Sequence, residues 1–325
     1  MISRKARNRK KVISFVMKLV AFIKPGSLSH FQIKIMRLLV LFASFRRANV
    51  NNVVVKKISL DQLELYRIIP NKISDKVKIL FFHGGGFFVG NFKIYRSYAS
   101  FLAEILGREI IFVEYKLSPE SKYPSQLEDA KKAYSFLLGK KEKSNIILAG
   151  DSAGGNLALA LFLALKKDKS KKPKGIFCIS PWVYPTAIMA EYPDSCCQSD
   201  VLIGPFIKRA KETGSGPLSY LYCNPSDHKN PLISPLFGDF KNSPPIMIQY
   251  AENEVLSVQI GQFLKRLKKQ RVKVVTKTWK DLWHDFQLET DLIETRRSFV
   301  FFKDFLDELC TCLLYTSDAA DETTG

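Results

Sequence analysis

The feature that most constrains the fold is a regular alternation, from residue 51 onward, of short apolar runs with longer helix-forming stretches. Several runs are continuously apolar, which is typical of parallel strands buried on both faces. The expected strands are 53–58, 63–69, 77–82, 110–115, 146–149, 176–179, 246–250 and 273–278. The pattern predicts an α/β fold with an eight-stranded, mostly parallel sheet. The short connection between the first two strands allows them to pair antiparallel.

Helical stretches separate the later strands, and two regions lie outside this rhythm. The expected helices are 95–106, 126–138, 155–166, 259–269 and 296–309. Residues 185–245 contain nine prolines and are expected to form an inserted helical and loop region above the sheet edge. Residues 1–50 are interpreted as two amphipathic helices with lysine and arginine on their polar faces. The main domain would then cover residues 51–311.

Composition excludes several classes of protein. The chain is 46% hydrophobic and 25% charged, which rules out a disordered chain, a collagen-like fibre and a small disulfide scaffold. Six cysteines show no C-x-x-C pair and no zinc spacing with histidine, so no metal site is indicated, and no cofactor is implied. The formal charge is +19, but the basic residues are spread along the chain without a nucleic-acid motif. We therefore expect no nucleic-acid partner.

The two ends of the chain carry separate expectations. The apolar stretch 12–23 is interrupted by Lys18 and is shorter than the about 20 residues that a membrane span needs. It also lacks a small-residue cleavage site, so we expect surface helices, acting as a lid over an apolar site or lying on an anionic membrane. We expect a cytoplasmic protein, with peripheral membrane contact left open. Residues 312–322 read CLLYTSDAADE and resemble a translated sequencing adapter, so 312–325 is interpreted as a non-native tail that follows Thr311.

The segment from Gly150 to Gly155, which reads GDSAGG, lies between an apolar run and a helical stretch. This strand–turn–helix context is the one that a G-x-S-x-G nucleophile turn requires. The two outer glycines would be needed because side chains there would crowd the turn. The context makes Ser152 a candidate nucleophile, and a plain glycine–serine turn is the alternative.

A second glycine-rich segment, His83-Gly84-Gly85-Gly86, follows the apolar run 78–82. Such a loop lets backbone N–H groups approach an oxyanion, and the expected donors are Gly84 and Gly85, joined by Ala153. A phosphate-binding loop is disfavoured because the lysine and serine of a P-loop are missing. His83 is expected to be structural.

The base and its orienting acid should follow the late strands, in the order serine, acid, histidine. Among His30, His83, His228 and His284, only the last follows a late strand, within Trp283-His284-Asp285-Phe286. The acid is expected after strand 246–250, where Glu252 and Glu254 both occur. Asp285 is adjacent to the histidine and is expected to be poorly placed to orient it.

Taken together, these motifs resemble the hormone-sensitive lipase family of α/β-hydrolase esterases over about residues 77–310. The resemblance also rests on Tyr115-Lys116-Leu117-Ser118-Pro119-Glu120 and on Ser180-Pro181-Trp182. It implies the α/β-hydrolase fold, a triad, an oxyanion hole and a cap built from residues 1–50 and the 185–245 insertion. The family usually has Asp at the acid position. Alignment on Leu256 assigns the role here to Glu254, with Glu252 as runner-up.

The resemblance implies a serine carboxylesterase that cleaves short- to medium-chain esters through an acyl-enzyme on Ser152. Phe87, Phe88 and Phe92 are expected to line an apolar substrate pocket, with simple core packing as the alternative. An amidase or formamidase of the same fold, or a catalytically silent ligand-binding member, would share these features. The expected partner is a small-molecule ester. The oligomeric state is left open, with a homodimer as one option.

Overall fold

The computed structural model describes residues 2–21, 30–44, 52–139, 145–187, 191–214, 218–227 and 229–321. Each expected strand is confirmed within one or two residues at its ends. The strands are β1 (Val53–Leu60), β2 (Leu63–Pro70), β3 (Val77–Phe82), β4 (Glu109–Glu114), β5 (Asn145–Asp151), β6 (Gly175–Ile179), β7 (Ile246–Ala251) and β8 (Val274–Trp279). They form one sheet in the order β1-β2-β4-β3-β5-β6-β7-β8. This is the α/β-hydrolase architecture that the sequence predicts.

Strand direction places the loops of the site along one edge. β1 pairs antiparallel with β2, and β2 antiparallel with β4, whereas the remaining pairs are parallel. Phe82 at the end of β3 lies opposite Gly150 on β5, and Asp151 lies opposite Ile179 on β6. Because carboxyl ends of parallel strands share an edge, the loops after β3, β5, β6, β7 and β8 converge there.

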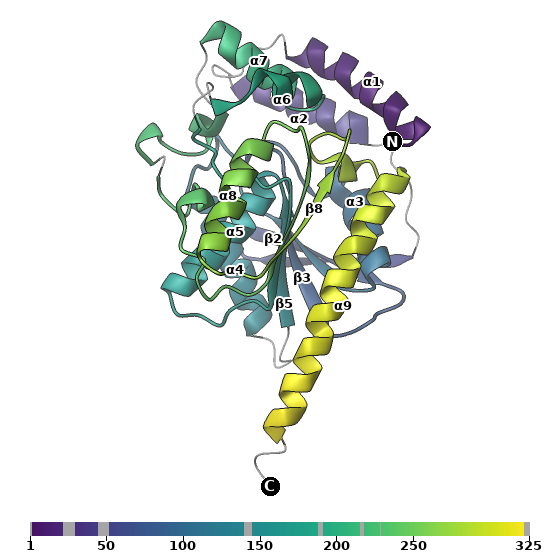
Figure 1. The fold of residues 1–325 in the computed structure, drawn as a ribbon, viewed down its shortest axis with the longest axis vertical. Helices are drawn as coiled ribbons and strands as arrows, with labels where there is room; N and C mark the ends of the chain where they lie inside the picture. Colours follow the sequence, from purple (N-terminus) through teal and green to yellow (C-terminus); the bar gives the residue numbers. More distant parts are fainter. Residues whose placement is uncertain are drawn as a thin grey trace.

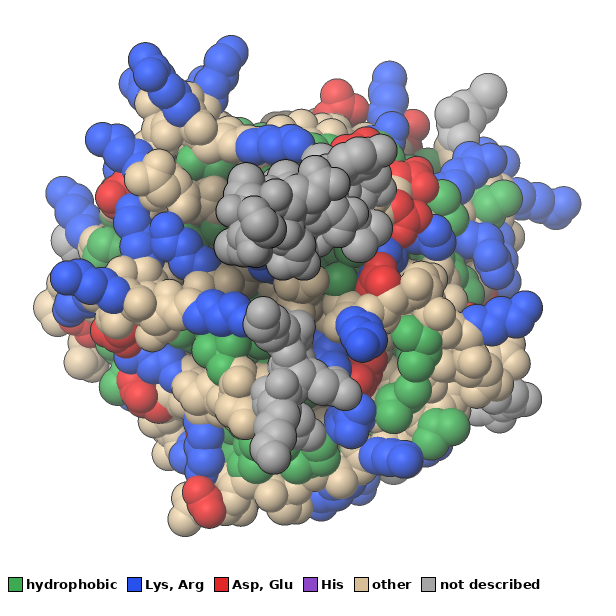
Figure 2. All heavy atoms as spheres, turned by 90° about the horizontal axis from the view of Figure 1, so that it is seen from below, with side chains coloured by type: hydrophobic (Ala, Val, Ile, Leu, Met, Phe, Trp, Pro, Cys, Tyr) green, Lys and Arg blue, Asp and Glu red, His purple; other side chains and the backbone are tan. Residues whose placement is uncertain are grey.

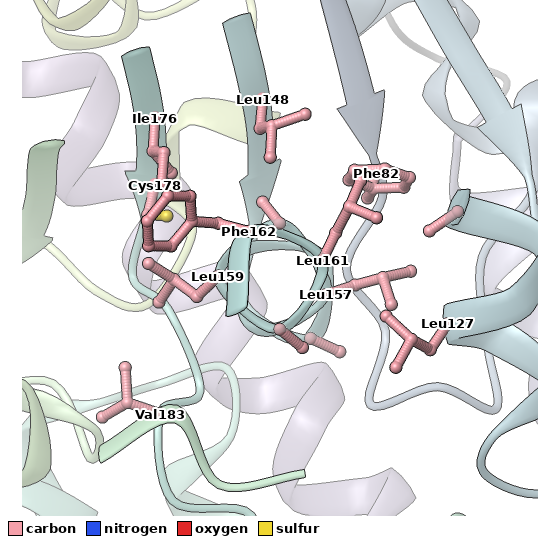
Figure 3. Packing of buried hydrophobic residues seen from close by; sticks show 14 of the residues in the cluster. Phe82, Leu127, Leu148, Leu157, Leu159, Leu161, Phe162, Ile176, Cys178 and Val183 are labelled. Atoms are coloured by element: carbon pink, nitrogen blue, oxygen red, sulfur yellow. The ribbon is translucent and has the colours of Figure 1, made fainter. Parts of the chain in front are cut away.

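Helices cover both faces of the sheet (Figure 1). α3 (Phe92–Leu106) and α9 (Ile293–Asp321) pack on one face, and their apolar side chains share a core cluster with the strands. α4 (Ser125–Leu138), α5 (Ala153–Lys167) and α8 (Ser257–Lys269) contribute to the cluster on the other face. Figure 3 shows Leu157 and Leu161 of α5 inside this cluster. All five expected helices are present. α9 continues to Asp321, through part of the stretch interpreted as a tail.

The N-terminal and inserted helices gather at one end of the molecule, the upper end in Figure 1. They are α1 (Arg4–Val20), α2 (His30–Ser44), α6 (Asp194–Ser199) and α7 (Gly204–Thr213). The rest of the insertion, where the structure describes it, consists of loops and the short 3-10 turns Leu218–Leu221, Pro225–Asp227 and Pro235–Phe237. Parts of 1–50 and 185–245, including His228, lie outside the described residues. Among the helices described, none is both long and apolar enough to cross a membrane.

Basic side chains are widely distributed over the molecule. Figure 2 shows the end opposite α1 and α2, where lysine and arginine are interspersed with acidic and hydrophobic side chains. The described side chains of this face form no single basic patch.

Candidate active site

Ser152 occupies a sharp turn between β5 and α5. Its backbone angles are φ 49° and ψ −115°, a strained conformation for a residue with a side chain. The predicted crowding around the turn is confirmed. A Cβ on Gly150 would lie 2.4 Å from the carbonyl carbon of Gly154, and one on Gly154 would lie 2.0 Å from the carbonyl oxygen of Phe82. Only glycine at these two positions lets β3, β5 and α5 approach closely enough to present the serine.

The structure brings Ser152, His284 and Glu254 together from three separate loops. The hydroxyl Oγ of Ser152 lies 3.0 Å from Nε2 of His284, and the other ring nitrogen, Nδ1, lies 3.2 Å from Oε1 of Glu254. All three side chains are buried. The arrangement suits an imidazole that donates from Nδ1 to the glutamate and accepts from the serine at Nε2. Glu252, the runner-up acid, is exposed.

The second oxygen of Glu254 is held by two donors that sequence reasoning missed. Oε2 accepts from the hydroxyl of Ser180 at 2.7 Å and from the backbone N–H of Ala251 at 2.9 Å. Ser180 follows β6 and has φ 43°, so its side chain is aimed by a strained turn. The Ser180-Pro181-Trp182 motif was a signal for this contact. These bonds fix the carboxylate that faces the imidazole.

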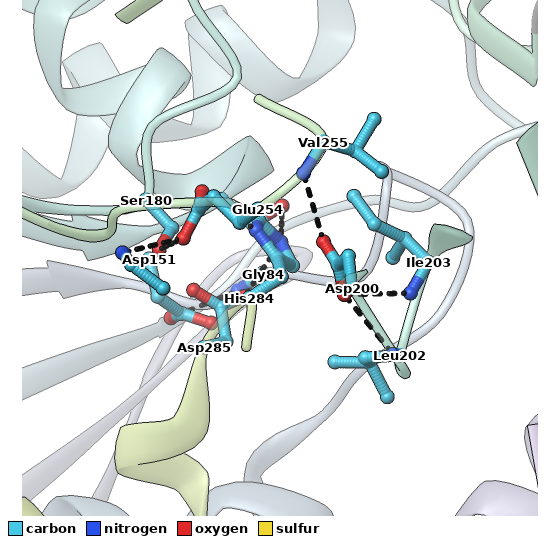
Figure 4. Close-up of polar contacts among 12 residues, drawn as sticks. Gly84, Asp151, Ser180, Asp200, Leu202, Ile203, Glu254, Val255, His284 and Asp285 are labelled. Atoms are coloured by element: carbon cyan, nitrogen blue, oxygen red, sulfur yellow. Dashed lines mark hydrogen bonds and ion pairs between the residues drawn. The ribbon is translucent and has the colours of Figure 1, made fainter. Parts of the chain in front are cut away.

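Asp285 contacts the imidazole at Nε2, the nitrogen that faces the serine, and not at Nδ1, where Glu254 lies; this agrees with the expectation that it is poorly placed to orient the ring. Its Oδ2 lies 3.1 Å from Nε2 of His284, and Figure 4 shows the two side chains together. Burial alone would lower the pKa of His284, but Asp285 and Glu254 raise it well above its ordinary value. Burial raises the pKa of Asp285 to about 6, although the histidine opposes this shift.

Two further acids lie buried near the histidine. Asp151 accepts from the N–H of Gly84 at 3.0 Å and from the hydroxyl of Tyr95 at 2.7 Å. Burial, helped by the nearby charge of Asp285, raises the pKa of Asp151 well above its usual range. Asp200 accepts from the N–H groups of Leu202, Ile203 and Val255 (Figure 4), and burial raises its pKa too.

The glycine loop departs from the sequence-based assignment at its first glycine. The N–H of Gly84 donates to Asp151 and to the hydroxyl of Tyr95, both at 3.0 Å. It is therefore unavailable to an oxyanion while these bonds hold. Gly85 has φ 102°, and a Cβ there would lie 2.1 Å from the carbonyl oxygen of Val89. The loop thus turns through conformations that only glycine adopts without strain, and the next amide, Gly86, follows at φ 62°.

His83 supports this loop as a neutral residue. Its Nδ1 lies 2.7 Å from the carbonyl oxygen of Gly84, and its ring stacks on Tyr115 at 4.2 Å between centroids. Burial lowers the pKa of His83 to about 4. The ring is therefore uncharged near neutral pH, which agrees with the expected structural role.

The phenylalanines expected to line a pocket have different positions. Phe87 is fully buried and stacks on Tyr222 at 3.9 Å, and Phe92 stacks on Tyr66 at 3.9 Å. Both are core residues, so they fit the alternative expectation, simple core packing, rather than a place in the lining of a substrate pocket. Phe88 packs instead with Val89 against Met36 of α2.

The N-terminal helices contact both halves of the site. Ala6 of α1 is fully buried in a cluster with Trp283 and Phe286, which flank the histidine. On α2, Arg37 donates from Nε to the carbonyl oxygen of Phe88 and from a second nitrogen to that of Ser118, each at 2.7 Å. Sequence reasoning expected a cover here but did not single out Arg37.

Several known proteins resemble this chain in sequence and in fold. A family model described as the alpha/beta hydrolase fold matches residues 79–288. An esterase of Acinetobacter venetianus is 32% identical over 65% of this chain and 67% of its own length. An acetyl-hydrolase of Streptomyces hygroscopicus is 30% identical over 63% of this chain and 67% of its own. A solved hormone-sensitive lipase from a metagenome library has a TM-score of 0.79 and 25% identity, and the similarity covers 92% of this chain and 98% of that one.

Proposed function

The chain belongs to the hormone-sensitive lipase family of α/β hydrolases and is a carboxylic ester hydrolase, and we propose that Ser152 is its nucleophile. The observation that carries the proposal is the 3.0 Å contact between Oγ of Ser152 and Nε2 of His284. Glu254 is the orienting acid, because its Oε1 faces the opposite ring nitrogen while Ser180 holds its Oε2.

The reaction follows from this arrangement. Nε2 of His284 takes the hydroxyl proton as Oγ of Ser152 attacks the ester carbonyl, and the carbonyl π pair moves onto oxygen. When the tetrahedral intermediate collapses, the C–O bond to the alcohol breaks, and the imidazolium gives its proton to that oxygen. Water then attacks the acyl-enzyme with the same proton transfers, which releases the carboxylic acid and restores Ser152. Glu254 remains an acceptor throughout.

We assign the oxyanion donors to the amides of Gly85, Gly86 and Ala153. The Gly84 amide is excluded because Asp151 and Tyr95 accept from it. Ala153 is the first residue of α5, where the N–H has no partner within the helix and the helix dipole favours negative charge. One such donor is typically worth about 3 kcal/mol in the transition state.

Residues 1–50, together with the 185–245 insertion, are proposed to act as a cap over this site. The support is the packing of α1 on the Trp283 loop and of α2 on the glycine loop. Phe88, Met36 and Leu221 pack together beside the glycine loop. We propose short- to medium-chain acyl esters as the substrates, which the resemblance to esterases of this fold supports. Whatever the preferred acyl length, the substrates belong to the class of small-molecule esters.

The test is hydrolysis of a chromogenic butyrate ester by the full chain and by the Ser152→Ala variant. We expect release of the chromophore by the wild type and a loss of at least about a thousandfold in kcat for Ser152→Ala. Ser125→Ala, a half-buried serine at the start of α4, is the matched control and should keep full activity. Full activity in Ser152→Ala would contradict the assignment of Ser152 as the nucleophile. If the wild type cleaved the matched butyramide faster than the ester, the chain would be reassigned to amide hydrolysis.

A further inference from the structure

The first sixty residues have an unusual charge composition. They contain 14 lysines and arginines and no aspartate or glutamate, and the first acid in the chain is Asp61. This stretch therefore accounts for most of the formal charge of +19. Such a one-signed segment creates a positive potential that attracts anionic partners.

The outer face of α2 is apolar, and no segment that the structure describes covers it. Phe31, Ile35 and Leu38 are 71%, 38% and 52% exposed, and their spacing of four and three residues puts them on one side of the helix. The opposite side already carries Ile33 and Met36, which are buried toward the body. A helix that is apolar on both sides is normally covered on both, so the exposed side calls for a partner.

The second half of α1 also exposes apolar side chains on its outer face. Val12, Phe15 and Val16 are 58%, 68% and 45% exposed, while Ala6 faces the Trp283 loop. Twelve large hydrophobic side chains are exposed in the described part of the chain, and six of them lie on these two helices. Both helices lie at the same end of the molecule (Figure 1), so the exposed apolar residues are concentrated there.

Lysines accompany these apolar side chains. Lys11 and Lys18 are exposed on α1, as is Lys34 on α2, within the same outward arcs as Phe15 and Phe31. Lysine is depleted in the cores of protein–protein interfaces. At a lipid surface, however, its long side chain reaches the headgroups while neighbouring aromatic and aliphatic groups enter the acyl boundary. A second copy of this chain would oppose positive charge with positive charge.

We propose that the outer faces of α1 and α2 form a docking surface for an anionic lipid bilayer. The docking surface comprises Val12, Phe15, Val16, Phe31, Ile35 and Leu38, with Lys11, Lys18 and Lys34 among them. The inner side of α2 packs on Phe88 and Val89 of the glycine loop, so the bilayer would lie about one helix diameter, roughly 10–12 Å, from that loop. Docking would hold the esterase at the surface in which lipophilic esters dissolve.

The experiment is sedimentation of the full chain with vesicles of phosphatidylcholine alone or of phosphatidylcholine mixed with phosphatidylglycerol. We expect the wild type to sediment with the mixed vesicles and to be released by added salt, because headgroup attraction is screened. The double variant Phe15→Ser/Phe31→Ser should lose at least about tenfold in partition coefficient, since two large apolar groups no longer enter the lipid. Its cleavage of a water-soluble butyrate ester should be unchanged, which shows that it is folded.

The matched control is Ile73→Ser, which changes another highly exposed apolar residue (59%), in the connection between β2 and β3. It should bind mixed vesicles as the wild type does. The proposal is overturned if the wild type stays in solution, if it binds both vesicle types equally, or if Ile73→Ser loses as much as the double variant. A dimer that the double variant abolishes, without vesicle binding, would assign the surface to a second copy instead. None of these outcomes depends on Ser152.

Discussion

At the scale of single residues, the site depends on how four buried acids are placed around one imidazole. Glu254 faces Nδ1 of His284, and Asp285 faces Nε2. Asp151 and Asp200 are bound mainly by backbone N–H groups and tyrosine. Residues of the same chemical type therefore have distinct roles, because each carboxyl has different donors.

The role of Glu254 can be tested against its sequence neighbour. Glu254→Gln should lower kcat by on the order of a thousandfold or more, because an amide cannot stabilise the imidazolium and can favour the wrong tautomer. Glu252→Gln changes an exposed side chain two residues away and should leave kcat within about twofold. Steady-state kinetics on one ester measures both. Equal effects of the two variants would contradict the assignment.

Asp285 should set the pH at which the base becomes active. The ionised carboxyl beside Nε2 stabilises the imidazolium and so raises the pKa of His284, with Glu254 acting from the other side and Asp200 nearby. Catalysis needs neutral His284, so activity increases as pH rises through this pKa. Asp285→Asn removes the charge and should move the acidic limb of kcat/KM to lower pH.

The control for this prediction is Asp281→Asn, an exposed acid in the same loop. Its pH profile should match that of the wild type. A profile of Asp285→Asn that stays in place, or that moves to higher pH, would show that the carboxyl does not act on the base. Tyr95 and Tyr98 lie near Asp285 and keep their protons throughout this range, because burial raises the pKa of each well above 10.

At the scale of secondary-structure elements, the turn between β5 and α5 depends on a close approach of backbone to backbone. Gly154→Ala would place a methyl group 2.0 Å from the carbonyl oxygen of Phe82. The chain must shift to relieve this contact, so we expect a lower melting temperature and at least about a hundredfold loss of kcat.

Gly261, inside α8, differs from Gly154 because no neighbouring element lies close to it. A methyl group on Gly261 would point into open space, with no neighbouring side chain or strand within 4 Å. Gly261→Ala should therefore stabilise the helix by about 0.5–1 kcal/mol and leave kcat unchanged. Thermal denaturation of both variants measures the contrast. Similar shifts for the two would mean that close approach does not explain the glycine at 154.

Element boundaries were largely predictable from sequence, whereas bond partners were not. Apolar runs such as 77–82 identify buried strands because burial on both faces leaves no polar alternation. The glycine motif located the oxyanion loop, but it did not indicate that Asp151 and Tyr95 occupy the amide of Gly84. That contact joins residues up to 67 positions apart, and local pattern carries no information about it.

At the scale of the whole molecule, the residues of the site lie at one edge of the sheet, in the loops that follow β3, β5, β6, β7 and β8. The order serine, acid, histidine predicted this assembly, because the topology of the fold fixes which loops converge. The contact of Asp285 with His284 was not predictable, since it depends on the left-handed backbone of Asp285 (φ 50°) and on the burial of its loop beneath α1. The sequence motifs therefore indicated which loops converge, whereas the contact between Asp285 and His284 depends on packing between distant elements.

The most direct test of the central claim is labelling of the full chain with a fluorophosphonate, followed by mass-spectrometric mapping of the modified peptide. A serine activated by an imidazole displaces fluoride from phosphorus, whereas ordinary serines do not react at comparable rates. The account predicts a single adduct on the peptide that contains Ser152, strongly slowed labelling in His284→Ala and none in Ser152→Ala. An adduct on another serine, or no adduct in an enzyme that still cleaves esters, would contradict it.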